Sequence, residues 1–184
     1  MALPLIAAIF MAILSTPPEA SAQLDDPMTV VTPIPRLART GFTPGETFQA
    51  ALVLEIKQGY YINSHSVSDP TLVPTEVEVP EEDPVTWPFV RYPEDLAKAG
   101  QTVGGLDGEK YRVRVVIRMV GRLPPDAKVG LLKTTLKVHY QTCTESVCLF
   151  PVAKSVEIAI PVVAPGTETK AINEDIFGRP GNGR

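Results

Sequence analysis

The sequence contains two residues whose type and spacing suit redox chemistry, Cys143 and Cys148, and they are its only cysteines. Four residues separate them, a length that fits the loop of a β-hairpin. Facing positions on paired strands have Cα atoms about 4.5 to 5.5 Å apart, which lies within the range for a disulfide. We therefore expect the two thiols to face each other across a tight turn, as either a fixed cross-link or a working dithiol-disulfide couple.

A cross-link between such close neighbours would stabilise the fold only slightly. Closing a ring of about six residues removes about 2 kcal/mol of unfolded-state entropy. Small secreted domains that depend on disulfides usually join distant segments, whereas 184 residues with 44% hydrophobic content can bury a core without such help. The spacing favours a redox function and leaves a purely structural bridge as the alternative.

No other residues form a convincing reactive set with the cysteines. His139 shares a predicted strand face with Cys143, but four residues along a strand span about 13 Å, beyond hydrogen-bond reach. The two histidines, His65 and His139, lack the spacing of zinc-finger ligands. A metal or copper chaperone using both cysteines, His139 and Met119 is a weaker hypothesis, because Met119 is predicted to face inward. We expect no cofactor and no metal.

Alternation of apolar and polar residues predicts the strands that position the cysteines. The clearest cover residues 47–57, 110–120, 132–143 and 152–161, with a shorter strand within 74–80. In the second of these, Val113 falls on the inward face with Tyr111 and Ile117. Residues 87–107 are irregular and predict a long loop with a mobile portion. Nineteen prolines and thirteen glycines add many turns, so the sequence predicts an all-β, immunoglobulin-like two-sheet β-sandwich in one domain.

The N-terminal segment of the chain predicts export. An apolar run over Ala2–Leu14 is too short to span a bilayer, and Ala20-Ser21-Ala22 suits signal peptidase. We expect a signal peptide over residues 1–22, cleaved after Ala22, and a mature chain without a membrane span in an oxidising compartment. An extended segment over 23–40, the domain over 41–163 and a flexible tail over 164–184 should follow. The net charge of −4 gives no reason to expect nucleic-acid binding.

Three stretches of the sequence form a recognisable set. They are Gly59–Ser64, then Ser68–Pro70 with Val73–Val77, and finally Tyr140–Cys143 with Cys148–Pro151. Together they resemble the N-terminal periplasmic domain of the thiol:disulfide interchange protein DsbD, and Trp87, Arg91 and Tyr92 before Tyr111 agree more loosely. The resemblance covers roughly residues 41–162, here as a stand-alone chain. The two cysteines are one residue closer together than in the best-known members of this family.

The resemblance implies an immunoglobulin-like protein-disulfide reductase or interchange component. Cys148 would be the attacking thiol and Cys143 the resolving thiol. Electrons would come from a membrane or thioredoxin-like donor on a separate protein, and would pass to periplasmic disulfide isomerases and cytochrome c maturation thioredoxins. A monomer is expected. Further residues implied at the site are Tyr60, Tyr61 and Asn63 beside the pair, and Phe89 and Tyr92 on a cap loop that shields the sulfurs.

The alternative to this function is an immunoglobulin-like protein-binding module whose hairpin disulfide only fixes a loop for its partner. In that case the cysteines would contribute shape and no chemistry. The two hypotheses differ in one measurable property, because only an exchange protein needs an accessible sulfur and a stabilised thiolate.

Overall fold

A computed structural model describes residues 24–98 and 104–178 of the chain. The predicted signal peptide, residues 1–22, lies outside the described residues. Within those ranges, no helix has both the length and the apolar character needed to cross a membrane.

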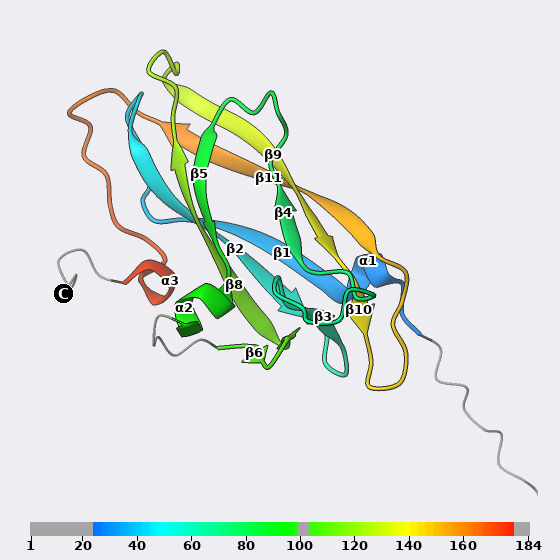
Figure 1. Cartoon of the computed structure of the whole chain (residues 1–184). Coiled ribbons are helices and arrows are strands. Elements are labelled where there is room, and N and C mark those ends of the chain that lie inside the picture. The colour runs from blue at the N-terminus through cyan, green and yellow to red at the C-terminus, as the bar shows by residue number, and fades with distance from the viewer. Residues whose placement is uncertain (1–23, 99–103, 179–184) are drawn as a thin grey trace, which may run out of the picture.

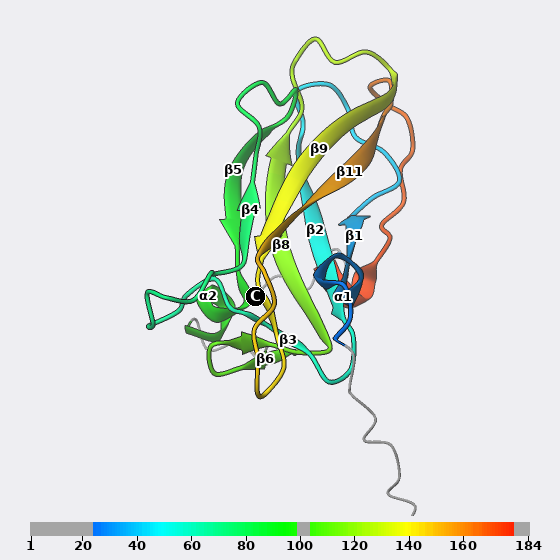
Figure 2. The same ribbon diagram turned by 90° about the vertical axis from the view of Figure 1, so that its right-hand side faces the viewer.

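Two antiparallel sheets form the layers of a sandwich (Figures 1 and 2). The first sheet has the order β1 (Val31–Leu37), β2 (Thr47–Ile56), β8 (Arg114–Arg122), β5 (Thr86–Arg91). The second has the order β11 (Val152–Val162), β9 (Gly130–Tyr140), β4 (Glu76–Glu78). The predicted immunoglobulin-like β-sandwich is confirmed.

The core lies between these two sheets, and the alternating apolar residues predicted from the sequence form most of it. Every second residue of the long strands points inward, and most of these side chains are apolar. Each stabilises the fold by about 1.5 to 3 kcal/mol through burial. The most deeply buried of them, at 0 to 1% exposure, are Leu52 and Leu54 of β2, Val115 and Ile117 of β8, Leu136 and Val138 of β9, and Ile158 and Ile160 of β11.

A third, smaller sheet joins the two layers at one end of the sandwich (Figure 1). Its order is β10 (Thr142–Cys143), β3 (Tyr61–Asn63), β7 (Lys110–Tyr111), β6 (Leu106–Asp107). Strand β10 follows β9 after one residue, Gln141, and β7 leads into β8, so strands of both layers extend into it. The small sheet therefore connects the first cysteine to both layers of the core.

Both ends of the described chain pack against the first sheet. Strand β1 pairs with β2 over its whole length, and helix α1 (Pro27–Val30) precedes it, capped by Asp26. Residues 164–178 belong to the predicted C-terminal tail, and part of this segment packs on the sheet. Helix α3 (Glu174–Phe177) buries Ile176 to 4% exposure, next to Ala51 and Val53. These apolar side chains explain why the segment packs.

Residues 87–98 are regular and do not form the long loop that the sequence predicted. Strand β5 is followed by helix α2 (Pro93–Lys98), and residues 99–103 lie outside the described chain. Glu94 of α2 is buried and accepts hydrogen bonds from the Ser66 backbone N–H at 2.7 Å and from the Tyr111 hydroxyl. Burial and then this bond to Glu94 raise the pKa of the Tyr111 phenol far above its ordinary value. Helix α2 is thus anchored to the small sheet.

The backbone bends at Val113, between β7 and β8. This residue has φ of 60° and is 72% exposed, so the prediction that it faces inward is wrong. A β-branched residue is strained in this left-handed region. The bend redirects the chain from the small sheet into the first sheet, which is why strict alternation fails at this one residue.

Replacing Val113 with Asn should stabilise the fold by about 1 kcal/mol, because Asn tolerates positive φ better than Val does. The free energy of unfolding in urea measures the effect. Val129→Asn is the matched control, since Val129 is 64% exposed and is not among the positive-φ residues. Equal effects of both substitutions would contradict the strain assigned to Val113.

Candidate functional site

The two cysteines form a disulfide at the edge of the small sheet. Cys143 lies in β10, opposite Tyr61 of β3. Cys148 lies opposite Cys143 as an isolated antiparallel bridge, with Cα atoms 4.0 Å apart. The prediction that the thiols face each other across a turn is confirmed.

A Thr144-centred turn shapes the loop between the cysteines. The Thr144 backbone N–H donates to the Val147 carbonyl at 2.8 Å. The Thr144 hydroxyl accepts from the backbone N–H groups of Ser146 and Val147 at 3.3 and 3.2 Å. The Leu149 N–H donates to the Thr142 carbonyl at 2.8 Å. Backbone hydrogen bonds therefore hold the loop on both sides of the disulfide, independently of the sulfur-sulfur bond.

The cysteines differ in their access to solvent. Cys143 is fully buried, at 0% exposure, whereas Cys148 is exposed. Only an accessible sulfur can be attacked by, or attack, a group on another protein. The asymmetry makes Cys148 the sulfur that a partner can reach and Cys143 the one held inside.

Apolar residues surround the exposed cysteine. A shallow hollow of about 330 Å³ is lined by Pro27, Cys148, Leu149 and Phe150, among others. Phe150 is 87% exposed, and Val147 on the other side of Cys148 is 41% exposed. Exposed apolar side chains gathered at one place are typical of surfaces that contact another protein.

The other side of the disulfide is charged. The Tyr61 ring carries two cations over its face, with Lys110 Nζ 4.3 Å and Arg112 Cζ 4.9 Å from the ring centroid. Glu145, in the loop between the cysteines, forms an ion pair with Arg112 at 2.8 Å. Arg112, followed by Lys110, holds the pKa of the Glu145 carboxyl below its usual range. Glu145 is thus a fixed negative charge inside the cysteine loop.

Asn63 supports the site through hydrogen bonds to neighbouring segments. It is 2% exposed and donates to the Val73 carbonyl at 3.0 Å and to Gln141 Oε1 at 3.4 Å. Gln141 in turn donates to the Leu149 carbonyl at 3.3 Å, beyond the second cysteine. Tyr60 lies further off, where its hydroxyl accepts from the backbone N–H of Asp25. Of the three residues implied beside the pair, Tyr61 is therefore the direct neighbour.

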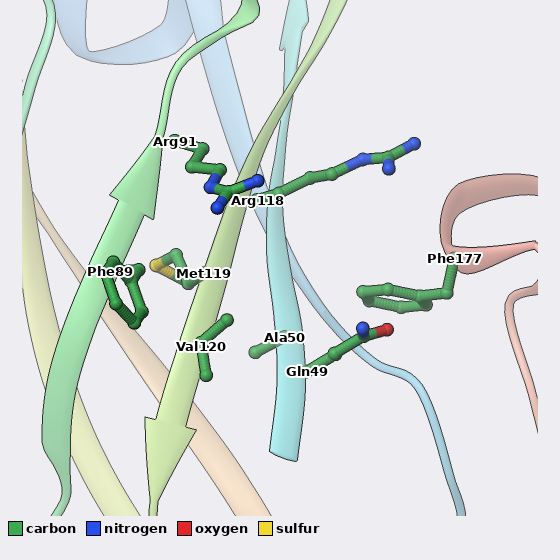
Figure 3. Close-up of a pocket in the computed structure, with 8 residues that line it drawn as sticks. All are labelled: Gln49, Ala50, Phe89, Arg91, Arg118, Met119, Val120 and Phe177. Carbon is green, nitrogen blue, oxygen red and sulfur yellow. The ribbon is translucent and has the colours of Figure 1, made fainter. Parts of the chain in front are cut away.

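The residues implied as a cap lie on other elements. Phe89 is on β5 of the first sheet, where it lines a pocket with Arg91, Arg118 and Phe177 (Figure 3). Tyr92 is 5% exposed, stacks on His65 at 3.7 Å between ring centroids, and accepts a hydrogen bond from the Val77 N–H. The shielding role of Phe89 and Tyr92 stays a prediction.

The residues considered for a metal site are not brought together. His139 contacts Glu78 at 2.6 Å on the surface of the second sheet, consistent with the distance argument that separated it from Cys143. Met119 is buried in β8 of the first sheet, and His65 packs on Tyr92. Within residues 24–98 and 104–178, no three His, Cys, Asp or Glu side chains are grouped to hold a metal ion.

Sequence reasoning did not single out the charged side of the site. Alternation placed Arg112 on the outward face of its strand, together with Arg114 and Arg118, and nothing in the pattern separated it from them. The position of Arg112 near the cysteines could be found only by knowing which strands are neighbours. Strand β7 lies beside β3, and β3 lies beside β10. Lys110 and Glu145 were missed for the same reason.

Comparison with known protein families gave one match. A family model described as the N-terminal part of the thiol:disulfide interchange protein DsbD matches residues 31–160. The matched range begins at β1 and ends within β11, and so includes both main sheets, the small sheet and both cysteines. A comparison with curated proteins gave no match.

The asymmetric burial of the cysteines predicts unequal alkylation. After reduction and removal of the reductant, iodoacetamide should modify Cys148 at least about tenfold faster than Cys143, since burial both blocks access and raises a thiol pKa. Mass spectrometry of peptides over a time course measures both rates. Equal rates would show that the two sulfurs are equally accessible once the disulfide is broken.

Proposed function

The chain belongs to the family of DsbD N-terminal domains, and on this premise we propose that it exchanges electron pairs with other proteins through Cys143 and Cys148. The electrons pass between a membrane or thioredoxin-like donor and periplasmic acceptor proteins. The observation that carries the proposal is the pairing of an exposed Cys148 with a buried Cys143 in one disulfide. A bridge with a purely structural role would need no accessible sulfur.

The exchange proceeds in two balanced steps. In the reduced protein, the Cys148 thiolate attacks one sulfur of the partner's disulfide, and the partner's other sulfur leaves as a thiolate and takes up a proton. A mixed disulfide now joins the two proteins. The Cys143 thiolate then attacks the Cys148 sulfur and releases the partner's second thiol. The partner gains two electrons and two protons, and the chain is left with its disulfide.

The geometry suits the second step because the resolving thiol is already in place. Cys143 is fixed by pairing between β10 and β3, and its Cα lies 4.0 Å from that of Cys148. The loop around Thr144 is held by backbone hydrogen bonds, so reduction leaves the two thiols close together. Pre-positioned reacting groups lower the entropic cost of the step.

The apolar rim supports a docking role. Phe150 and Val147 flank Cys148 and expose apolar surface that a partner's reactive disulfide could cover. Burial of such surface on binding is favourable in free energy, and it excludes water from the reacting sulfurs. We propose thioredoxin-like proteins as the partners, a periplasmic location and a monomeric state, with Tyr61 as the immediate neighbour that covers the inner sulfur.

Replacing Cys143 with Ser should trap the first intermediate. The variant leaves Cys148 without a resolving thiol, so incubation with the oxidised form of a thioredoxin-like protein should give a 1:1 mixed disulfide on a non-reducing gel. Dithiothreitol should reduce this mixed disulfide and separate the two proteins. Cys148→Ser is the matched control and should give little adduct, because its remaining thiol is buried. Equal adduct from both variants, or none from either, would contradict the assigned roles.

The reduction potential separates exchange from a static bridge. Structural disulfides usually have potentials below about −300 mV. We expect a higher value here, because the ring is short and one sulfur is exposed. Equilibration with glutathione or dithiothreitol mixtures measures it. A potential below about −300 mV, together with no exchange with thioredoxin-like proteins, would favour the alternative of a binding module with a structural hairpin disulfide.

A further inference from the structure

Two cations, Lys110 and Arg112, lie over the ring of Tyr61, the residue that pairs with Cys143 in the small sheet. Cys143 of β10 pairs with Tyr61 of β3, and the neighbouring pair joins Ile62 to Tyr111 of β7. Arg112 directly follows Tyr111 and therefore continues the row of Cys143 and Tyr61 on the same face. The Arg112 guanidinium lies over the Tyr61 ring, as the contact of 4.9 Å confirms.

The loop between the cysteines contributes the opposite charge. Glu145 lies two residues after Cys143 and three before Cys148, and it reaches Arg112 Nη2 at 2.8 Å and Lys110 Nζ at 3.5 Å. A carboxylate in the loop between the cysteines disfavours a thiolate there, since two negative charges repel each other. The cations offset this repulsion while they stay in place.

The chain holds Arg112 in this direction at a cost in backbone strain. Its guanidinium also pairs with Asp107 at 2.9 Å, and its N–H donates to the Gly105 carbonyl at 2.7 Å. A side chain at Gly105 would collide with the backbone, because a Cβ there would lie 2.1 Å from the Arg114 carbonyl oxygen. The next residue, Val113, is the strained one with φ of 60°. Arg112 is therefore followed directly by the strained bend that turns the chain into the first sheet.

We propose that Arg112, assisted by Lys110, is a positioning residue that tunes the reactivity of Cys148 by compensating the charge of Glu145. The inference rests on the proposed exchange function and adds the group that favours its thiolate. Arg112 does not touch the reacting sulfurs. It acts through Glu145, whose charge it neutralises and whose loop it holds.

The other charged groups near Cys148 are already engaged. Across the apolar hollow, Asp25 pairs with Lys57 at 2.7 Å and Asp26 caps the Met28 N–H. Lys154 donates to backbone carbonyls of the same segment. Among the described residues, Lys110, Arg112 and Glu145 therefore form the charged cluster that includes a residue of the cysteine loop itself, Glu145.

Four variants test the proposal through the pH profile of Cys148 alkylation in the reduced protein. Arg112→Gln should raise the thiolate pKa and slow the reaction at pH 7 by about two- to fivefold, because Glu145 is left with less compensation. Glu145→Gln should lower the pKa and accelerate the reaction by a similar factor. The double variant should react at nearly the parent rate. Arg112→Lys keeps the positive charge and should retain most of the parent rate.

The opposite signs distinguish charge compensation from a mere tether. Both single variants break the same ion pair, so a purely structural latch predicts changes in the same direction. That result, or no change in either variant, would overturn the proposal. Arg114→Gln is the matched control, because Arg114 pairs with Asp175 at 3.6 Å on the first sheet. Circular dichroism confirms that each variant is folded before its rate is compared.

The alkylation test needs no protein partner, so its outcome is separate from that of the trapping experiment. Opposite shifts in rate without any mixed disulfide would retain the charge effect and refute the exchange function. Mixed-disulfide formation without opposite shifts would retain the function and refute the role of Arg112.

Discussion

The pairing of β10 with β3 is the constraint on which the site depends. Strand β9 belongs to the second sheet, and one residue beyond its end the same chain is paired in the small sheet. This change of partner takes Cys143 away from the β9–β11 hairpin and buries it against Tyr61. The returning chain carries Cys148 along the outside of the same edge. A single switch in strand pairing thus produces one buried sulfur and one accessible sulfur from residues only five positions apart.

The disulfide separates two surfaces of different chemistry. On the side of Phe150 and Pro27 the surroundings are apolar, which suits contact with other proteins. On the side of Arg112 and Glu145 they are charged and tied to the small sheet. The Glu145 side chain is 71% exposed and the Arg112 side chain 30%, so this charged surface is open to solvent as well.

Local pattern was sufficient to predict most of the sandwich and the cysteine hairpin. Alternation located β2, β8, β9 and β11 because their inward residues all face one core. It failed at Val113, where the chain changes sheets, and it did not locate the short C-terminal helix, where Ile176 and Phe177 pack against the first sheet. The cluster of Arg112 and Glu145 was out of reach because it depends on which strands are neighbours. Pairing between distant segments leaves no trace in the spacing of one strand.

The backbone of the cysteine loop has a consequence for the energetics of the redox cycle. Strands β9 and β11, eleven residues each, are paired up to the loop by contacts that do not involve the sulfurs. In a thermodynamic cycle, the free energy by which the disulfide stabilises the fold equals that by which the fold stabilises the disulfide. For so short a ring this is about 2 kcal/mol, equivalent to a shift of about 40 mV in reduction potential. The fold and the disulfide therefore stabilise each other only weakly, because the ring that the disulfide closes is short.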